Sequence, residues 1–192
     1  MSVSTFAHIQ ELKIDYLEAL EWRSEALAQL IFRDIKMIKK YTPTAMKNYP
    51  RLSEKLSWSC KQLFELNQKS SIVHFAVINS QGLIVAHNRS AQIDQQVSSD
   101  LRSHIQKNNT VTVLDGDRYH TLIPIIEHIN EQDIFFGMID IGVPKKVVSL
   151  KIKRLLINSI GLLALFLLVT FFCISLILYV VVGRPLSKLM HV

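Results

Sequence analysis

The chain has 192 residues, of which 49% are hydrophobic, and its formal net charge is +6. This length suits one medium-sized domain with an appendage. The basic residues are scattered and are not interleaved with aromatic side chains, which argues against a nucleic-acid-binding protein. The two cysteines, Cys60 and Cys173, fall in a predicted soluble helix and in an apolar run, so we predict no disulfide.

The first predicted element is a long helix over residues 6–40. This stretch contains no proline and no glycine, and its apolar residues recur at spacings of three, four and seven. Such a helix would be roughly 50 Å long and needs a surface along which to pack. Two surfaces remain open: the chain's own sheet, or the same helix of a second copy in a dimer.

The N-terminus lacks the basic segment and apolar core of a signal peptide. If the domain lies outside the cytoplasm, we therefore expect a first membrane helix upstream of Met1. Pro43 and Pro50 then interrupt the helical pattern. A second helix is predicted over residues 51–67, with an apolar face that includes Cys60.

After the second helix, the pattern changes to short β-rich runs. The runs VHFAVIN (residues 73–79) and GLIVAHN (residues 82–88) are joined by NSQG, which predicts a hairpin. Residues 88–98 are polar and predict a loop. A short helix is predicted to follow, capped by Ser98 or Ser99.

A second hairpin is predicted around Asp115-Gly116, because this dipeptide favours a type I′ turn between TVTVL and DRYHTLIPI. EHINEQD is predicted as a loop, and IFFGMIDIGV as the last strand, which Pro144 ends. The order of elements predicts an α+β fold, with the long N-terminal helices packed on one face of a five-stranded antiparallel sheet. Residues 88–109 would cover the other face and leave a pocket beneath them.

The C-terminal part is predicted to be a transmembrane helix. Residues 155–183 carry no charged side chain, and about 20 apolar residues suffice to span a bilayer. Basic residues are more numerous before this span than after it, which by the positive-inside rule would place the preceding domain in the cytoplasm. These residues are Lys145, Lys146, Lys151, Lys153 and Arg154 before the span, and Arg184 and Lys188 after it.

Three stretches, HFAVINSQGLIVAHN, TVLDGDRYHTLIPI and FFGMIDIGVPKKVV, resemble the PAS-like extracytoplasmic sensor domains called Cache or PDC domains. In that family long helices precede the sheet, a later strand carries a tyrosine, and a final strand with a glycine leads into a membrane helix. The ending GRPLSKLMHV resembles the start of a HAMP linker, with Arg184, Pro185, Leu186 and Leu189 at the matching positions.

These resemblances imply the input module of a bacterial transmembrane signalling receptor. The sensor domain would be periplasmic, the span would cross the inner membrane, and two copies would pair through the N-terminal and transmembrane helices. The missing output domain would be a histidine kinase, a diguanylate cyclase or phosphodiesterase, or a chemoreceptor signalling domain. The implied parts are residues 1–69 (helices), 70–147 (Cache sheet), 148–183 (juxtamembrane and transmembrane helix) and 184–192 (start of the HAMP linker).

The sequence contains no GxSxG, phosphate-loop or GxGxxG motif, and its seven histidines form no HxxxH or HExxH pair. We therefore predict neither an enzyme nor a bound metal or cofactor. A ligand pocket is better motivated, and a carboxylate- or amine-bearing molecule, such as an amino acid or organic acid, would suit it. The candidate ligand-binding residues are His87, Asn88, Arg89, Arg118, Tyr119, His120 and Asp140.

Asp140 is the most informative of these candidates, because a buried carboxylate is unstable without a partner. We expect it to pair with Arg89 or Arg118, and to share a face of its strand with Ile134, Phe136 and Met138. The structural alternatives are that His87 only ends a strand, that Tyr119 belongs to the core, and that Asp140 faces water.

Two functions of different kinds remain open. The leading one is a ligand sensor that passes its signal from the last strand into the membrane helix, because residues 143–154 read as a stiff connection. The alternative is a membrane-anchored scaffold without a small ligand, in which the N-terminal helix binds a partner chain. The flanking charges leave a third arrangement, a cytoplasmic PAS-like domain with a C-terminal anchor.

Overall fold

The structure is a computed structural model, and it describes residues 3–41, 49–67, 71–105, 109–129 and 132–179. The chain divides into two compact units, Met1–Ser149 and Leu150–Val192. The helices are α1 (Val3–Tyr41), α3 (Tyr49–Leu66), α4 (Ser99–Ile105) and α5 (Lys145–Leu178), with a short 3₁₀ helix, η2 (Ser90–Gln92). The strands are β1 (His74–Asn79), β2 (Ile84–His87), β3 (Val111–Asp115), β4 (Arg118–Ile129) and β5 (Gln132–Pro144).

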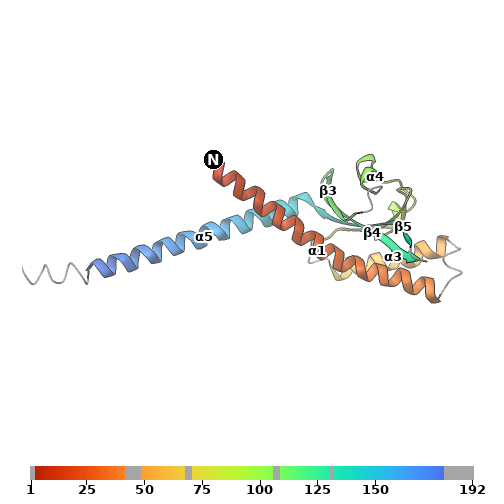
Figure 1. Cartoon of the computed structure of the whole chain (residues 1–192), viewed down its shortest axis with the longest axis horizontal. Coiled ribbons are helices and arrows are strands. Elements are labelled where there is room, and N and C mark those ends of the chain that lie inside the picture. The colour runs from red at the N-terminus through yellow and green to blue at the C-terminus, as the bar shows by residue number, and fades with distance from the viewer. Residues whose placement is uncertain (1–2, 42–48, 68–70, 106–108, 130–131, 180–192) are drawn as a thin grey trace, which may run out of the picture. The chain divides into compact units, whose positions relative to one another are not determined.

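The predicted α+β architecture is confirmed. One five-stranded antiparallel sheet has the strand order β2-β1-β5-β4-β3. Helices α1 and α3 cover one face of this sheet and α4 lies over the other (Figure 1). The last strand, β5, therefore lies in the middle, between β1 and β4.

The two long helices form where the apolar periodicity predicts them. On α1 the buried side chains include Leu20, Ile31 and Ile38, which belong to the predicted stripe, and this helix packs on α3, β3 and β4 of its own chain. On α3 the buried positions include Cys60, and the hydroxyl of Ser53 donates a 2.6 Å hydrogen bond to a β2 carbonyl. Of the two packing surfaces that the sequence left as alternatives for the long helix, α1 therefore uses the chain's own sheet.

The α4 face of the sheet has its own small core. Ser98 begins α4, since its hydroxyl accepts a hydrogen bond from the backbone N–H of Leu101 at 3.3 Å, as expected of an N-cap. Beneath the helix, apolar side chains of β1, β2, β4 and β5 pack together with it. This cluster comprises Ala76, Ile78, Ile84, Leu101, Ile105, Leu122 and Met138.

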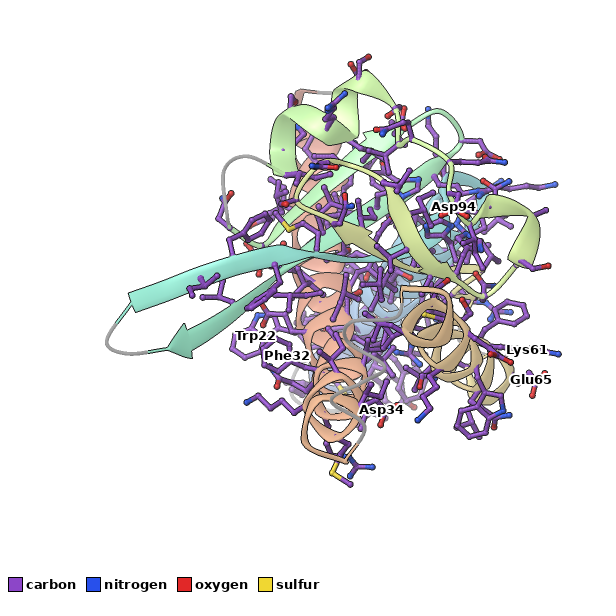
Figure 2. The ribbon with its side chains drawn as sticks, turned by 90° about the vertical axis from the view of Figure 1, so that its right-hand side faces the viewer. Trp22, Phe32, Asp34, Lys61, Glu65 and Asp94 are labelled. Carbon is purple, nitrogen blue, oxygen red and sulfur yellow. The ribbon has the colours of Figure 1, made fainter. Side chains whose placement is uncertain are left out.

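Two details of the β4 hairpins differ from the sequence prediction. Asp115 pairs with Arg118, so Gly116 is the first of the two turn residues; its φ is 58°, whereas Asp117 has no positive φ. This is the glycine-first pattern of a type II′ turn, not type I′. The predicted loop EHINEQD is mostly strand, because the two arms of the β4–β5 hairpin continue to pair with each other as far as Ile129 and Gln132; Figure 2 shows this hairpin extending past the other strands.

A β-bulge in β5 explains a third difference. Ile125 pairs with Gly137 but Ile126 pairs with Phe135, so one residue of β5 is extra at this point. Phe135, and not Phe136, consequently packs against the cluster that contains Met138. The prediction that Phe136 and Ile134 share the face of Asp140 is wrong, because the extra residue reverses the alternation; both are about 40% exposed.

The second unit contains most of α5. Within the described residues α5 is the one helix that is long and apolar enough to cross a membrane, by length and composition. It begins at Lys145, directly after β5 ends at Pro144. The predicted HAMP segment, residues 184–192, lies outside the described residues.

Candidate functional site

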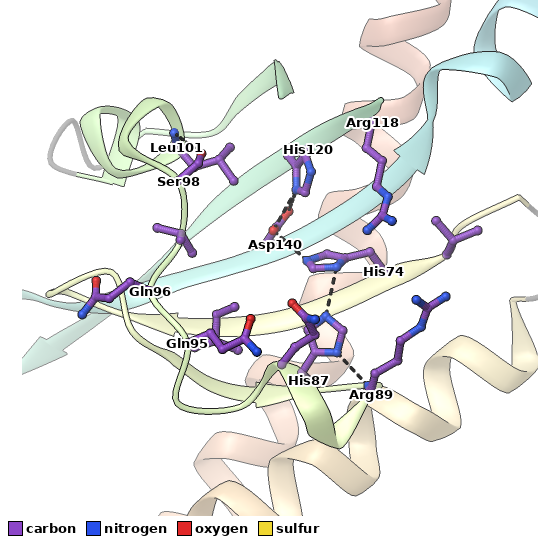
Figure 3. Close-up of a pocket in the computed structure, with 14 residues that line it drawn as sticks. His74, His87, Arg89, Gln95, Gln96, Ser98, Leu101, Arg118, His120 and Asp140 are labelled. Carbon is purple, nitrogen blue, oxygen red and sulfur yellow. Dashed lines mark hydrogen bonds and ion pairs between the residues drawn. The ribbon is translucent and has the colours of Figure 1, made fainter. Parts of the chain in front are cut away.

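A pocket of about 290 Å³ lies between the sheet and the segment that leads into α4. Its position agrees with the expectation that the segment after β2 covers this face. Figure 3 shows polar side chains of β1, β2, β4, β5 and the covering segment around it. The polar lining comprises His74, His87, Arg89, Arg118, His120 and Asp140 from the strands and their ends, and Gln92, Gln95, Gln96 and Ser98 from the covering segment.

Four of these side chains form a hydrogen-bonded row across the pocket floor, which we call the His–Asp cluster: His87, His74, Asp140 and His120 (Figure 3). His87 Nε2 lies 3.0 Å from His74 Nδ1, and His74 Nε2 lies 2.8 Å from Asp140 Oδ2. His120 Nδ1 lies 2.9 Å from the same oxygen and 3.0 Å from Oδ1. All four side chains are buried.

The sheet register explains why these residues meet. His74 on β1 and His120 on β4 are both paired with Gly142 of β5, which lies between them. Asp140 is two residues away and so on the same face. Because glycine has no side chain, the two imidazole rings can approach each other over β5, with 5.2 Å between their centroids. A Cβ at Gly142 would lie 2.7 Å from the Cβ of His74.

The backbone fixes the direction of the hydrogen bonds. The N–H of Arg89 donates to His87 Nδ1 at 2.7 Å, so a neutral His87 carries its proton on Nε2 and donates to His74 Nδ1. In neutral His74 the proton is then on Nε2, which donates to Asp140. His120 donates to the same carboxylate through Nδ1–H.

The environment shifts the pKa values of the cluster. Burial lowers the pKa of His87 to about 4, and the neighbouring His74 adds to this, so His87 is neutral at pH 7. Burial alone would raise the pKa of Asp140, but the charges and hydrogen bonds of His74 and His120 outweigh it and hold this pKa well below its usual range. Burial also opposes protonation of His120, yet its hydrogen bond to Asp140 raises its pKa overall.

The structure brings five of the seven predicted site residues to the pocket: His87, Arg89, Arg118, His120 and Asp140. The other two have structural surroundings. Asn88 accepts a hydrogen bond from the N–H of Phe75 through Oδ1 at 3.1 Å, which joins β1 to the end of β2. Tyr119 is buried, and strand alternation places it on the opposite face from His120.

Two aspects of the site were not predicted. Asp140 pairs with His74 and His120, and not with Arg89 or Arg118 as expected, because the register places the two histidines beside it. His74 was missed altogether, and the sequence carries no spacing signal for it, since it lies 66 residues before Asp140. One nitrogen from each of these two histidines and one oxygen of Asp140 lie within 4.8 Å of one another, a set that could hold a metal ion.

The two arginines give the pocket its charge. Figure 3 shows the side chains of Arg89 and Arg118 on the same side of His74. Arg118 also contacts Asp117 at 3.4 Å, but that carboxylate is 86% exposed, and such surface pairs contribute little. The pocket therefore presents cationic groups above a carboxylate that already accepts hydrogen bonds from two imidazoles.

Comparisons with known proteins give structural similarities only. No family model matches the chain, and no curated protein matches it. The chain is similar to the crystal structure of the E. coli DcuS sensor domain, with 13% identity and a TM-score of 0.45, over 66% of this chain and 97% of that chain. It is also similar to an extracellular ligand binding receptor from Desulfohalobium retbaense, with 15% identity and a TM-score of 0.39, over 64% of this chain and 25% of that chain.

Proposed function

We propose that this chain is the input module of a bacterial transmembrane receptor, in which the pocket binds a small anionic molecule and β5 passes the binding event into α5. The observation that carries this proposal is the position of the pocket. Its floor includes Asp140 of β5, and β5 continues without an intervening loop into the helix that could span a membrane.

The sign of the ligand follows from the charges around the pocket. Arg89 and Arg118 offer guanidinium groups, which bind carboxylates and phosphates in a planar, bidentate geometry. Asp140 is the one carboxylate among the lining residues, and it already accepts hydrogen bonds from two histidines. Of the two ligand chemistries that suit the sequence, a carboxylate-bearing molecule is therefore favoured over an amine.

The path of the signal is short. The backbone N–H of Lys145, the first residue of α5, donates a 2.8 Å hydrogen bond to the carbonyl of Asp117 in the β3–β4 turn. One turn later Val148 is buried. A ligand that draws Arg118 inwards would therefore act on the turn that holds the start of α5. Inserting Gly-Gly-Ser after Ser149 should abolish signalling while leaving ligand affinity unchanged, and signalling that survives this insertion would contradict the mechanism.

The remaining parts of the receptor belong to the same proposal. The sensor unit would be periplasmic, α5 would span the inner membrane, and a HAMP linker would follow it. Trp22, Leu30 and Met37 of α1 are 76%, 41% and 49% exposed, which supports pairing of two copies along this helix. Reporter fusions at the C-terminus would test the orientation: cytoplasmic reporter activity is expected, and periplasmic activity would overturn the periplasmic placement.

Ligand binding can be tested on the full chain in detergent micelles. Screening amino acids, organic acids and phosphate esters by thermal shift should find an anion that raises the melting temperature, because a ligand that binds the folded state stabilises it. Arg89→Ala and Arg118→Ala should each weaken its binding at least tenfold, whereas Arg33→Ala, on the exposed side of α1, should not. Equal affinity in all three variants would exclude the pocket as the binding site.

The scaffold alternative has one observation in its favour, the exposed Trp22 and Trp58 on the two long helices. Such residues are typical of protein–protein contacts. Two results together would favour this alternative over the sensor. The broad screen would find no stabilising anion, and the chain would form a stable complex with another protein that Trp22→Ala disrupts.

A further inference from the structure

The His–Asp cluster also brings together nitrogen and oxygen atoms that can ligate a metal ion. The proposed binding of an anion by the two arginines does not involve these atoms. His74, His120 and Asp140 come from three adjacent strands, and their donor atoms all lie within 4.8 Å of one another. The side chains are 8%, 7% and 2% exposed. The set is therefore held by the sheet itself and not by mobile loops.

We propose that these three residues form a binding site for a divalent transition-metal ion, with Zn²⁺ as the best match. The ligand atoms would be His74 Nε2, His120 Nδ1 and one oxygen of Asp140. Two imidazoles and one carboxylate suit zinc and its first-row neighbours, whereas calcium and magnesium prefer oxygen ligands. Three protein ligands also leave one coordination position open, as in zinc sites that bind an exogenous molecule.

The geometry requires only a small adjustment. Ligands about 2.1 Å from a tetrahedral zinc ion are roughly 3.4 Å from one another. The His74–Asp140 and His120–Asp140 contacts are 2.8 Å and 2.9 Å. Each of these two contacts must therefore widen by about half an ångström as the ion replaces the two hydrogen-bonding protons, which move to the other nitrogens of their rings. The two histidine nitrogens, which lie within 4.8 Å of each other, must approach by no more than about 1.4 Å. Side-chain rotation supplies such a change without moving the strands.

His87 would position the first of these ligands. A metal ion on His74 Nε2 leaves the proton of a neutral imidazole on Nδ1, which faces His87 Nε2 at 3.0 Å. His87 must then accept this proton's hydrogen bond, and so it must carry its own proton on Nδ1 and release the N–H of Arg89. The loss of one such hydrogen bond lowers the affinity by about tenfold, which is small beside the affinity of protein zinc sites.

The arginines of the pocket oppose a cation, but their effect is limited. The side chain of Arg118 is 36% exposed, Arg89 is exposed as well, and solvent screens both charges. Asp140, in contrast, is fully enclosed with the imidazoles. The negative charge nearest to the metal is thus the least screened charge in the pocket.

The test uses the full chain in detergent micelles, without a polyhistidine tag and freed of metal by chelation. Titration with Co²⁺ should give one bound ion per chain and visible ligand-field bands of a nitrogen- and oxygen-ligated site, without sulfur charge-transfer bands, and Zn²⁺ should displace it. Asp140→Asn and His120→Ala should each weaken binding at least a hundredfold, more than the loss typical of residues that only position ligands.

Two matched variants separate ligands from neighbours. His87→Gln should keep the cobalt spectrum and change the affinity by no more than about a hundredfold, and His104→Ala, a histidine on α4, should change nothing. Circular dichroism reports whether each variant is folded. If a variant does not fold, the cobalt titration and cobalt spectrum of the parent chain decide whether the metal site exists. Absence of stoichiometric binding, or parent-like affinity in both ligand variants, would overturn the metal site without bearing on the receptor function.

Discussion

Replacing Asp140 by Asn tests whether an ionised carboxylate holds the floor of the pocket together. The change keeps the volume of the side chain and removes its charge. The amide oxygen can still accept the hydrogen bond of His74, and the amide nitrogen can donate to Nδ1 of a neutral His120, so we expect the chain to fold. Two charge-assisted hydrogen bonds then become neutral ones.

The expected loss follows from the two contacts. Hydrogen bonds to charged groups contribute about 1.5–3 kcal/mol and neutral ones about 0.5–1.5 kcal/mol, so the change should lower the free energy of unfolding by about 2–3 kcal/mol. The unit Met1–Ser149 is of a size for which 1 kcal/mol corresponds to about 2–4 °C. The melting temperature of this unit should therefore fall by about 5–10 °C.

The measurement is thermal unfolding of the full chain in detergent, followed by circular dichroism with EDTA present so that bound metal does not contribute. Glu54→Gln, an equally conservative change at an exposed position of α3, serves as the control and should shift the transition by no more than about 1 °C. If Asp140→Asn behaved like this control, the carboxylate would not be ionised and paired in the folded chain.

Three further predictions concern the packing around the site. Gly137→Ala should destabilise the Met1–Ser149 unit by about 3 kcal/mol or more, because a Cβ there would clash with the backbone carbonyl oxygen of Ile78 on β1. Gly116→Ala, with open space around it, should lose only about 1–2 kcal/mol from its positive φ; chemical denaturation gives both values. Ser53→Ala should lose about 1–2 kcal/mol by leaving a buried β2 carbonyl without this partner, and an unchanged denaturation midpoint would contradict that contact. Burial, with a contribution from the charge of Asp34, raises the pKa of Cys60 from 9.0 to about 12, so above pH 9 the unfolded chain releases a proton that the folded chain retains. The free energy of unfolding of the parent, relative to that of Cys60→Ala, should then fall by about 1.4 kcal/mol per pH unit between pH 9 and 12. A difference that does not change with pH would contradict the raised pKa.

The helices and most strands could be predicted because their signals are local. The stripe with Leu20 and Ile31 repeats within one helix, and the β-rich runs end at glycine and proline. The errors arise where pairing overrides composition: the polar segment between β4 and β5 continues as strand because its two arms pair with each other. The bulge next to Gly137 likewise has no signal in the sequence pattern of apolar and polar residues.

Part of the pocket could also be predicted, because some of its residues have a local signal in the sequence. His87, Arg89 and Asp140 stand out as polar residues at the ends or in the middle of apolar strands. Their partners could not be inferred, because the contact between His74 and His120 depends on the order of strands in space. Only once β5 is known to lie between β1 and β4 does Gly142 become the position at which the two histidines meet.

The central position of β5 also has a consequence for folding. The β1–β2 and β3–β4 hairpins are local and can form early, but only β5 joins them in the sheet, and its pairing with β1 connects residues 58–68 positions apart. Such long-range pairing is slow to form. During synthesis the sheet cannot close until β5 has emerged, and α5 is the next element to leave the ribosome. We therefore expect the Met1–Ser149 unit to complete its fold only as α5 begins to emerge, with the edges of β1 and β4 open to chaperones until then.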